Sequence, residues 1–183
     1  MQKEFSIEFI KEICKRYQGG ESVLPLRKAF SFDDKEGCVI TAMDIANSDI
    51  LLEYKYWFFC YNIFSKEQNQ KIAIQLMEAI LPIFEREYPN DLRPRKAIEA
   101  TKLYIAGGIR FDELKEAGSG AHTAGRSIYS TNSSAACIAY AADYATHFVW
   151  YNTHHSISAV YSVAISVDAN ASQKILIDFI NNN

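Results

Sequence analysis

The sequence lacks a long hydrophobic run and an excess of basic residues. A membrane-spanning helix needs roughly 18 consecutive apolar residues, and no apolar stretch in this sequence of 183 residues approaches that length. The most apolar segment, residues 54–64, is too short and contains Lys55. The net charge of −3 and the pI near 5.8 argue against a general nucleic-acid binder, because such proteins carry a basic surface. We therefore expect a single globular domain over residues 1–183, with no membrane or nucleic-acid partner.

The sequence also lacks paired cysteines. Its four cysteines, Cys14, Cys38, Cys60 and Cys137, form no CxxC motif, which excludes a zinc ribbon. The N-terminal residues are charged and amphipathic and contain no unbroken apolar segment of the kind found in signal peptides. We expect reduced thiols, no metal site and a cytoplasmic location.

Familiar catalytic signatures are missing as well. There is no GxSxG motif, no phosphate-binding P-loop and no GxGxxG motif between a strand and a helix. The glycine-containing segment 118–125 lacks the lysine of a P-loop. The sequence therefore predicts no catalytic residues and no cofactor.

Amphipathic helices account for most of what is present. The clearest pattern covers residues 65–88, where Ser65 and Gln68 form a capping box and apolar residues follow at helical spacing. Pro82 lies inside this pattern and predicts a kink. Further helices are expected at residues 6–17, 49–64, 94–106, 111–129 and 133–151, and more weakly at 37–48.

Residues 156–167 fit two patterns. They alternate as a strand would, but Ile157, Val160, Tyr161, Ala164 and Val167 also recur at helical spacing. A single strand in a helical protein would leave its backbone groups unpaired, so a helix is favoured. With a short helix at 171–180, the prediction is an all-α bundle of about seven to nine helices with mostly antiparallel neighbours.

A cationic cluster stands at the predicted start of the 94–106 helix. Arg93, Arg95 and Lys96 lie where the helix dipole disfavours positive charge. The favoured interpretation is an internal staple, in which the arginines bond to nearby carboxylates. The candidate carboxylates are Glu85, Glu87, Asp91 and Glu99, of which Glu99 lies four residues after Arg95. The alternative is a site for an external carboxylate or phosphate, which the planar guanidinium group binds with two hydrogen bonds.

Histidines mark two further segments. His122 and Arg126 share one face of the 111–129 helix, either as a polar edge or with the histidine bonded to a carboxylate. Asp143, His147, Tyr151 and His154 recur at a spacing of three to four residues, and Asp143 and His147 are expected to pair. Residues on one face of one helix do not surround a metal ion, so this pattern predicts no metal site.

The central block "AILPIFEREYPNDLRPRKAIEATKLYIAGG", followed by "AGSGAHTAGRS" and "SSAACIAYAADYATH", resembles a family of immunity proteins. This is the fifth-numbered all-α immunity family of bacterial polymorphic-toxin systems. The resemblance covers residues 50–165, whereas residues 1–48 are not informative of the family and residues 168–183 are expected to form a short helix and a tail. Asp143 and Tyr144 depart from the family pattern. The matching positions are Pro82, Glu85, Pro89, Asp91, Arg93, Pro94, Arg95, Ala97, Ile98 and Glu99.

The resemblance implies a protein that binds and neutralises a cognate toxin domain without catalysis. The mildly acidic balance of the chain is compatible with a basic toxin surface. The alternative function is a small helical enzyme or ligand-binding domain with a polar pocket for an anionic ligand. The candidate binding residues are Arg93, Arg95, Glu99, His122 and Arg126. Aromatic contacts with a toxin could come from Trp57, Trp150 and Tyr151.

Overall fold

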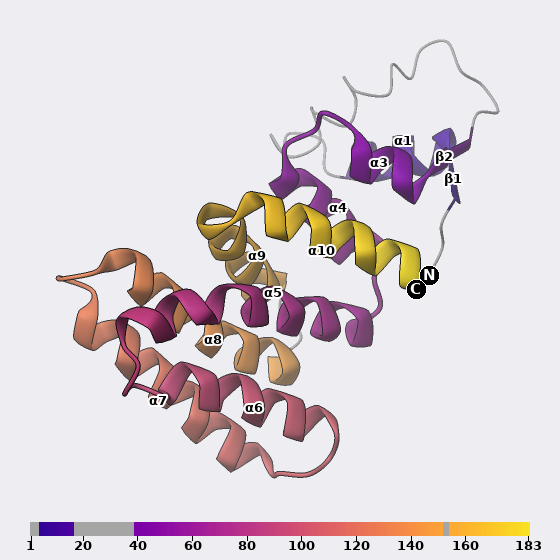
Figure 1. Cartoon of the computed structure of the whole chain (residues 1–183). Helices are drawn as coiled ribbons and strands as arrows, with labels where there is room; N and C mark the ends of the chain where they lie inside the picture. Colours follow the sequence, from indigo (N-terminus) through magenta and orange to yellow (C-terminus); the bar gives the residue numbers. More distant parts are fainter. Residues whose placement is uncertain (1–3, 17–38, 152–153) are drawn as a thin grey trace. The chain divides into compact units, whose positions relative to one another are not determined.

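Helices dominate the computed structural model, which describes residues 4–16, 39–151 and 154–183 (Figure 1). This part of the chain contains nine helices and two short strands, so the predicted all-α class is confirmed. The chain divides into two units. The first comprises residues up to Phe64 together with Gln173–Asn183, and the second comprises Ser65–Ser172. The expectation of a single domain stays a prediction.

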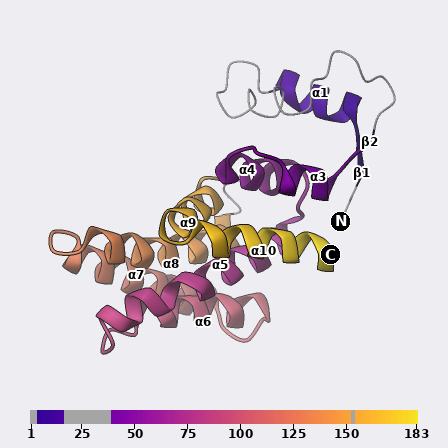
Figure 2. The ribbon, with the colours of Figure 1, turned by 45° about the horizontal axis from the view of Figure 1, so that its top comes forward.

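The first unit contains a small antiparallel sheet that the sequence did not predict. Strand β1, Glu4–Ser6, pairs with β2, Val39–Thr41, with Phe5 opposite Ile40. Figure 2 shows that β1 leads directly into helix α1, Ile7–Arg16, and β2 into α3, Ala42–Asn47. The prediction of one helix over residues 37–48 is therefore wrong for Val39–Thr41. Three consecutive β-branched residues favour an extended backbone, and β1 supplies the hydrogen-bond partners.

Aromatic side chains form the core of the first unit. The helix α4, Leu52–Asn62, buries Phe58 and Phe59 completely, and Phe5 of β1 packs edge-on against Phe58 with ring centroids 5.7 Å apart. Phe64 contacts Phe179 of helix α10, Ala169–Asn182, at 5.1 Å. Lys55 is also buried, and its ammonium donates to the Ala46 carbonyl over 2.8 Å. The predicted buried helix at 49–64 is confirmed.

The second unit begins with the helix that the capping box predicts. The Ser65 hydroxyl accepts from the Gln68 backbone amide, and α5 extends over Lys66–Glu87. The helix continues through Pro82, whose side chain is exposed. The following helices are α6, Arg93–Ile105, α7, Phe111–Ile128, α8, Ser133–Tyr151, and α9, His154–Val167.

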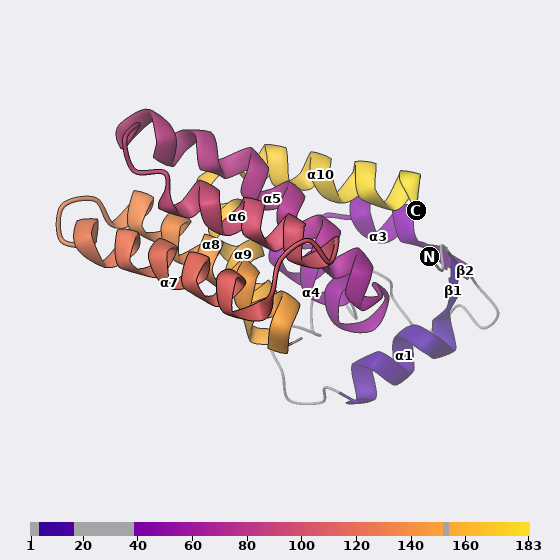
Figure 3. The same ribbon diagram turned by 90° about the horizontal axis from the view of Figure 1, so that it is seen from below.

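Helix α8 is central to the second unit, where it packs against α5, α6, α7 and α9. Figure 3 shows α7 and α8 side by side. Ala135, Ala139, Ala142 and Thr146, which are small residues, are all buried along α8. Because small side chains allow close approach, neighbouring helices can surround α8.

The ambiguous segment 156–167 lies in α9, so its prediction as a helix is confirmed. Ile157, Val160 and Ala164 are fully buried at helical spacing. Among the described residues, no helix is both long and apolar enough to cross a membrane.

Candidate functional site

Arg95, in the cationic cluster at the start of α6, bonds to two carboxylates of α5. The Arg95 Nε donates to Oε1 of Glu85 over 2.7 Å and Nη2 donates to Oε2 over 3.0 Å. Its Nη1 donates to Oε2 of Glu78 over 2.7 Å. The hydrogen bonds to Glu85, followed by those to Glu78, raise the pKa of Arg95 further above its usual value. The predicted internal staple is confirmed, because these bonds tie the start of α6 to α5.

Lys102 extends this network by two turns of α6. Its Nζ lies 2.6 Å from Oε1 of Glu78 and 2.9 Å from Oε1 of Glu99. Burial alone would raise the pKa of Glu78, but hydrogen bonds from Lys102 and Arg95 outweigh burial and lower it. Glu99, which was expected to pair with Arg95, therefore pairs with Lys102 instead.

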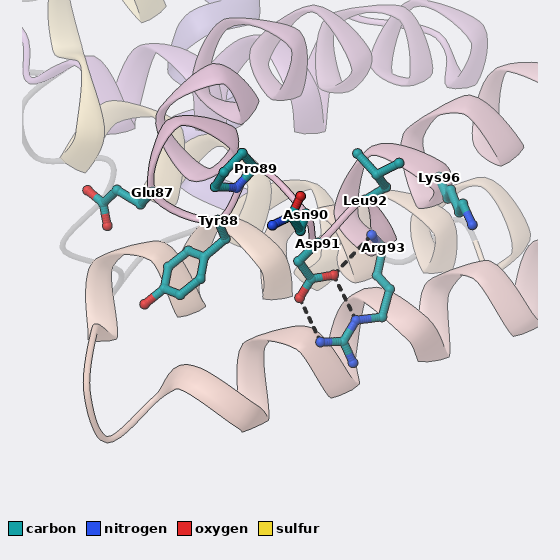
Figure 4. Close-up of a pocket in the computed structure, with 8 residues that line it drawn as sticks. All are labelled: Glu87, Tyr88, Pro89, Asn90, Asp91, Leu92, Arg93 and Lys96. Atoms are coloured by element: carbon teal, nitrogen blue, oxygen red, sulfur yellow. Dashed lines mark hydrogen bonds and ion pairs between the residues drawn. The ribbon is translucent and has the colours of Figure 1, made fainter.

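Arg93 makes a separate ion pair at the α5–α6 turn. The Asp91 carboxylate accepts from Nε of Arg93 over 2.8 Å, from Nη2 over 2.6 Å and from the Arg93 backbone amide over 3.2 Å. These bonds lower the pKa of Asp91. The pair lines an open hollow of about 690 Å³. Figure 4 shows the Asp91 carboxylate facing the Arg93 guanidinium, whereas Glu87 and Lys96 point away from the pair.

A buried carboxylate and two histidines meet between α7 and α8. The Asp143 side chain is only 7% exposed, and its Oδ2 lies 3.1 Å from Nδ1 of His122. Its Oδ1 lies 3.8 Å from Nδ1 of His147. Burial raises the pKa of Asp143, although both histidines oppose this shift. The predicted Asp143–His147 pair is present, and His122, which lies on the neighbouring helix, makes the shorter contact.

Two glycines bring α7 close to α8 around this carboxylate. A Cβ atom placed on Gly118 would lie 2.3 Å from Oγ1 of Thr146 and 2.9 Å from Oδ1 of Asp143. A Cβ on Gly125 would lie 2.8 Å from the Tyr140 ring. These distances are shorter than van der Waals contact, so the packing of α7 on α8 requires glycine at both positions.

Side chains that are exposed or, in the case of Tyr140, half-buried form two adjacent rows beside this contact, one on α7 and one on α8. The His122 and Tyr140 rings lie 5.1 Å apart and the Tyr129 and Tyr140 rings 6.4 Å apart, which joins the two rows. Tyr129 and Tyr144 are 59% and 43% exposed. We call this surface the α7–α8 face; its residues are His122, Arg126, Tyr129, Tyr140, Tyr144 and His147.

The five candidate binding residues do not share one pocket in the described part of the chain. Arg95 and Glu99 form ion pairs with residues of α5 and α6. Of the five candidates, only Arg93 lines the hollow at the α5–α6 turn. His122 and Arg126 belong to the α7–α8 face. Their role in binding stays a prediction.

Sequence reasoning missed Glu78 as a partner of Arg95. Glu78 and Glu85 are seven residues apart on α5, as are Arg95 and Lys102 on α6. Matching charges at this spacing on two antiparallel helices could have indicated the network. The tyrosines of the α7–α8 face also had a sequence signal, because Tyr140 and Tyr144 are four residues apart and therefore share one side of a helix.

The structure describes some, but not all, of the cysteines and aromatic residues that the sequence analysis named. Cys60 is buried and Cys137 is half-buried, and neither forms a disulfide bond. Burial raises the pKa of Cys60. Trp57 is half-buried, whereas the side chains of Cys14, Trp150 and Tyr151 and all of Cys38 lie outside the described residues. The described residues contain no cluster of three or more side chains that could hold a metal ion.

The described residues define an all-α protein with one small two-stranded sheet, in which Arg93 and Arg95 bond to the protein's own carboxylates and the α7–α8 face is exposed. Residues 61–176 match a family model described as "Imm-5 like putative immunity protein". The match covers more than half of the chain, so the protein belongs to this immunity-protein family, and the resemblance noted in the sequence is confirmed. No curated protein and no solved structure matches the chain.

Proposed function

We propose that this protein binds the toxin domain of a bacterial polymorphic-toxin system directly and neutralises it in the cytoplasm, without catalysis of its own. Membership in the immunity-protein family supports a protein partner. The observation that carries the proposal is the α7–α8 face, which exposes aromatic and cationic side chains inside the matched segment 61–176. Tyrosine and arginine side chains are enriched among the residues that dominate protein–protein binding energy.

The charged cluster at the start of α6 supports the same proposal because it argues against the alternative function, a pocket for an anionic ligand. The guanidinium groups of Arg93 and Arg95 hydrogen-bond to carboxylates of the protein itself. An anionic ligand at this place would have to compete with Asp91, Glu85 and Glu78. These ion pairs favour a structural role for the cluster over a ligand pocket.

To neutralise a toxin by binding alone, this protein must cover part of the toxin surface with a stable interface. Specific protein–protein interfaces bury on the order of 800 Å² on each partner. Helices make suitable platforms for such a contact, because a rigid backbone loses little conformational freedom on binding. The ion pairs between α5 and α6 and the close packing of α7 on α8 supply this rigidity.

The proposal is tested by co-expression with the product of the adjacent gene. We expect that product to arrest growth when expressed alone, and this protein to restore growth and to co-purify with it. A toxin variant without its own activity gives a partner for purification at high yield. If this protein neither restores growth nor co-purifies, while it turns over a small substrate, the proposed function is wrong.

A further inference from the structure

The α7–α8 face differs from the rest of the protein in its charge. The exposed row on α7 recurs at helical spacing and ends in His122, Arg126 and Tyr129. The two preceding positions of this row are Lys115 and Ser119, and both are exposed. The row on α8 continues from Tyr140 through Tyr144 to His147, and the one carboxylate within this stretch, Asp143, is buried beneath the two histidines. The face therefore carries cationic and phenolic groups although the chain as a whole has a net charge of −3.

We propose that the α7–α8 face docks the toxin and receives a segment of the toxin that presents carboxylates. This inference rests on the proposed function and adds the binding surface and the chemistry of the partner. It differs from the basic toxin surface that the overall acidic balance suggested, because the local charge of an interface matters more than the net charge of the chain.

Arg126 is the principal cation available for this contact. Within the described residues the Arg126 side chain forms neither an ion pair nor a hydrogen bond, unlike those of Arg93 and Arg95. A guanidinium group binds a carboxylate with two parallel hydrogen bonds. Arg126 can therefore engage a toxin carboxylate without breaking an internal contact.

His122 is oriented for the same contact by Asp143. The Asp143 carboxylate holds Nδ1 of His122 at 3.1 Å, while the histidine side chain remains 50% exposed. Because Nδ1 faces the buried carboxylate, Nε2 on the other side of the ring is the nitrogen available to a partner. Asp143 thus acts as a positioning residue for the face rather than as a contact.

The tyrosines supply apolar area and hydroxyl donors. Tyr129 and Tyr144 are among the exposed large hydrophobic residues of the second unit. Tyrosine buries a large area on binding, has few rotatable bonds and can donate its hydroxyl proton to a carboxylate. Tyr140 packs between His122 and Tyr129, which fixes the centre of the face.

Phosphate groups of a nucleic acid would also bind cationic side chains, but the composition of the face favours a protein. Nucleic-acid affinity depends on several arginines and lysines that contact successive phosphates. The face offers Arg126 and, at its edge, Lys115, among tyrosines and histidines. Aromatic residues around a single arginine are instead typical of protein interfaces.

The inference is tested with the purified full-length protein and the inactive toxin from the adjacent gene. Titration calorimetry should show that Arg126→Glu and Tyr144→Ala each weaken binding about tenfold or more. The control is Arg86→Glu, since Arg86 is an exposed cation on α5, outside the face, and this change should leave the affinity within about twofold. Circular dichroism of each variant verifies folding. Binding of the unmodified protein should weaken as salt is raised, and less so for Arg126→Glu.

A charge exchange identifies the toxin side of the contact. Replacing single toxin carboxylates by lysine should reveal one change that weakens binding to the unmodified protein and restores binding to Arg126→Glu. If the unmodified protein binds the toxin but Arg126→Glu and Tyr144→Ala bind equally well, the inference is overturned and the proposed function stands. The same conclusion follows if these variants lose only self-association or only binding to an RNA oligonucleotide. If the unmodified protein does not bind the toxin, both proposals fail.

Discussion

Nε of Arg95 lies 2.7 Å from Oε1 of Glu85, ten residues earlier in the chain and on the preceding helix. This contact explains why a cation stands at the start of α6, where the helix dipole opposes it. The dipole disfavours a cation by a few tenths of a kcal/mol, whereas a partly buried hydrogen bond between charged groups contributes about 1.5–3 kcal/mol. The ion pair therefore outweighs the dipole.

Removing the Arg95 guanidinium should destabilise the protein. Arg95 is 27% exposed and lies between Glu78 and Glu85, so Arg95→Gln would leave two carboxylates without their shared cation. We expect the free energy of unfolding to fall by about 1–3 kcal/mol, as measured by urea denaturation at pH 7. Arg86→Gln is the matched control, because Arg86 is exposed on the same pair of helices, and it should change stability by less than about 0.5 kcal/mol. Equal effects of the two substitutions would contradict the staple.

The contribution of Glu78 should disappear in acid. Its pKa is lowered from 4.5 in the folded protein, so the unfolded chain binds a proton more readily. The ionised carboxylate therefore stabilises the fold above about pH 4.5, and this stabilisation is lost as the pH falls through the lower folded value. The stability difference between the unmodified protein and Glu78→Gln should be larger at pH 7 than at pH 3. Glu116→Gln, a change of an exposed carboxylate on α7, should show no such trend.

Asp143 should respond to pH in the opposite direction. Its pKa is raised from 3.8 by burial, so the folded protein binds the proton more readily than the unfolded chain. Stability should therefore fall as the pH rises from about 3.8 through the higher folded pKa. Asp143→Asn removes this titration, and chemical denaturation between pH 3 and pH 7 should show that the unmodified protein loses stability relative to the variant. A constant difference across this range would contradict the burial effect.

Three glycines of α7 should respond differently to alanine. Gly118→Ala places a methyl group against Thr146 and Asp143, and Gly125→Ala places one against Tyr140 and the Ala136 carbonyl. Each should destabilise the protein by about 1–3 kcal/mol, because α8 would have to shift. Gly120 faces Arg93, and a Cβ there would lie 3.9 Å from the Arg93 side chain, which is ordinary contact. Gly120→Ala should therefore stabilise the helix by about 0.5–1 kcal/mol, and thermal unfolding of the three variants provides the comparison. Destabilisation by Gly120→Ala would show that α7 and α6 pack more closely there than described.

Local sequence signals determined most of the helices. The pattern at 133–151 has the same bounds as α8, and the capping box of Ser65 marks the start of α5. Such signals are readable because a capping hydroxyl, a helix-breaking proline or an apolar stripe acts within a few residues of its own position. An internal carboxylate partner for Arg95 was also predictable, because several acidic residues lie nearby in the sequence, but the sequence left open which of them it would bond.

Only the tertiary structure decided which distant groups meet. Val39–Thr41 forms a strand because β1, more than thirty residues away, offers backbone partners. Asp143 contacts His122 from another helix, and Glu78 joins Arg95 across 17 residues. Helical periodicity predicts which side chains share a face, but not the helix that the face will meet, because that choice depends on packing over the whole unit. The sequence by itself therefore determined the helices and the charges available, and the packing of α7 on α8 decided which histidines, tyrosines and arginine form one exposed face.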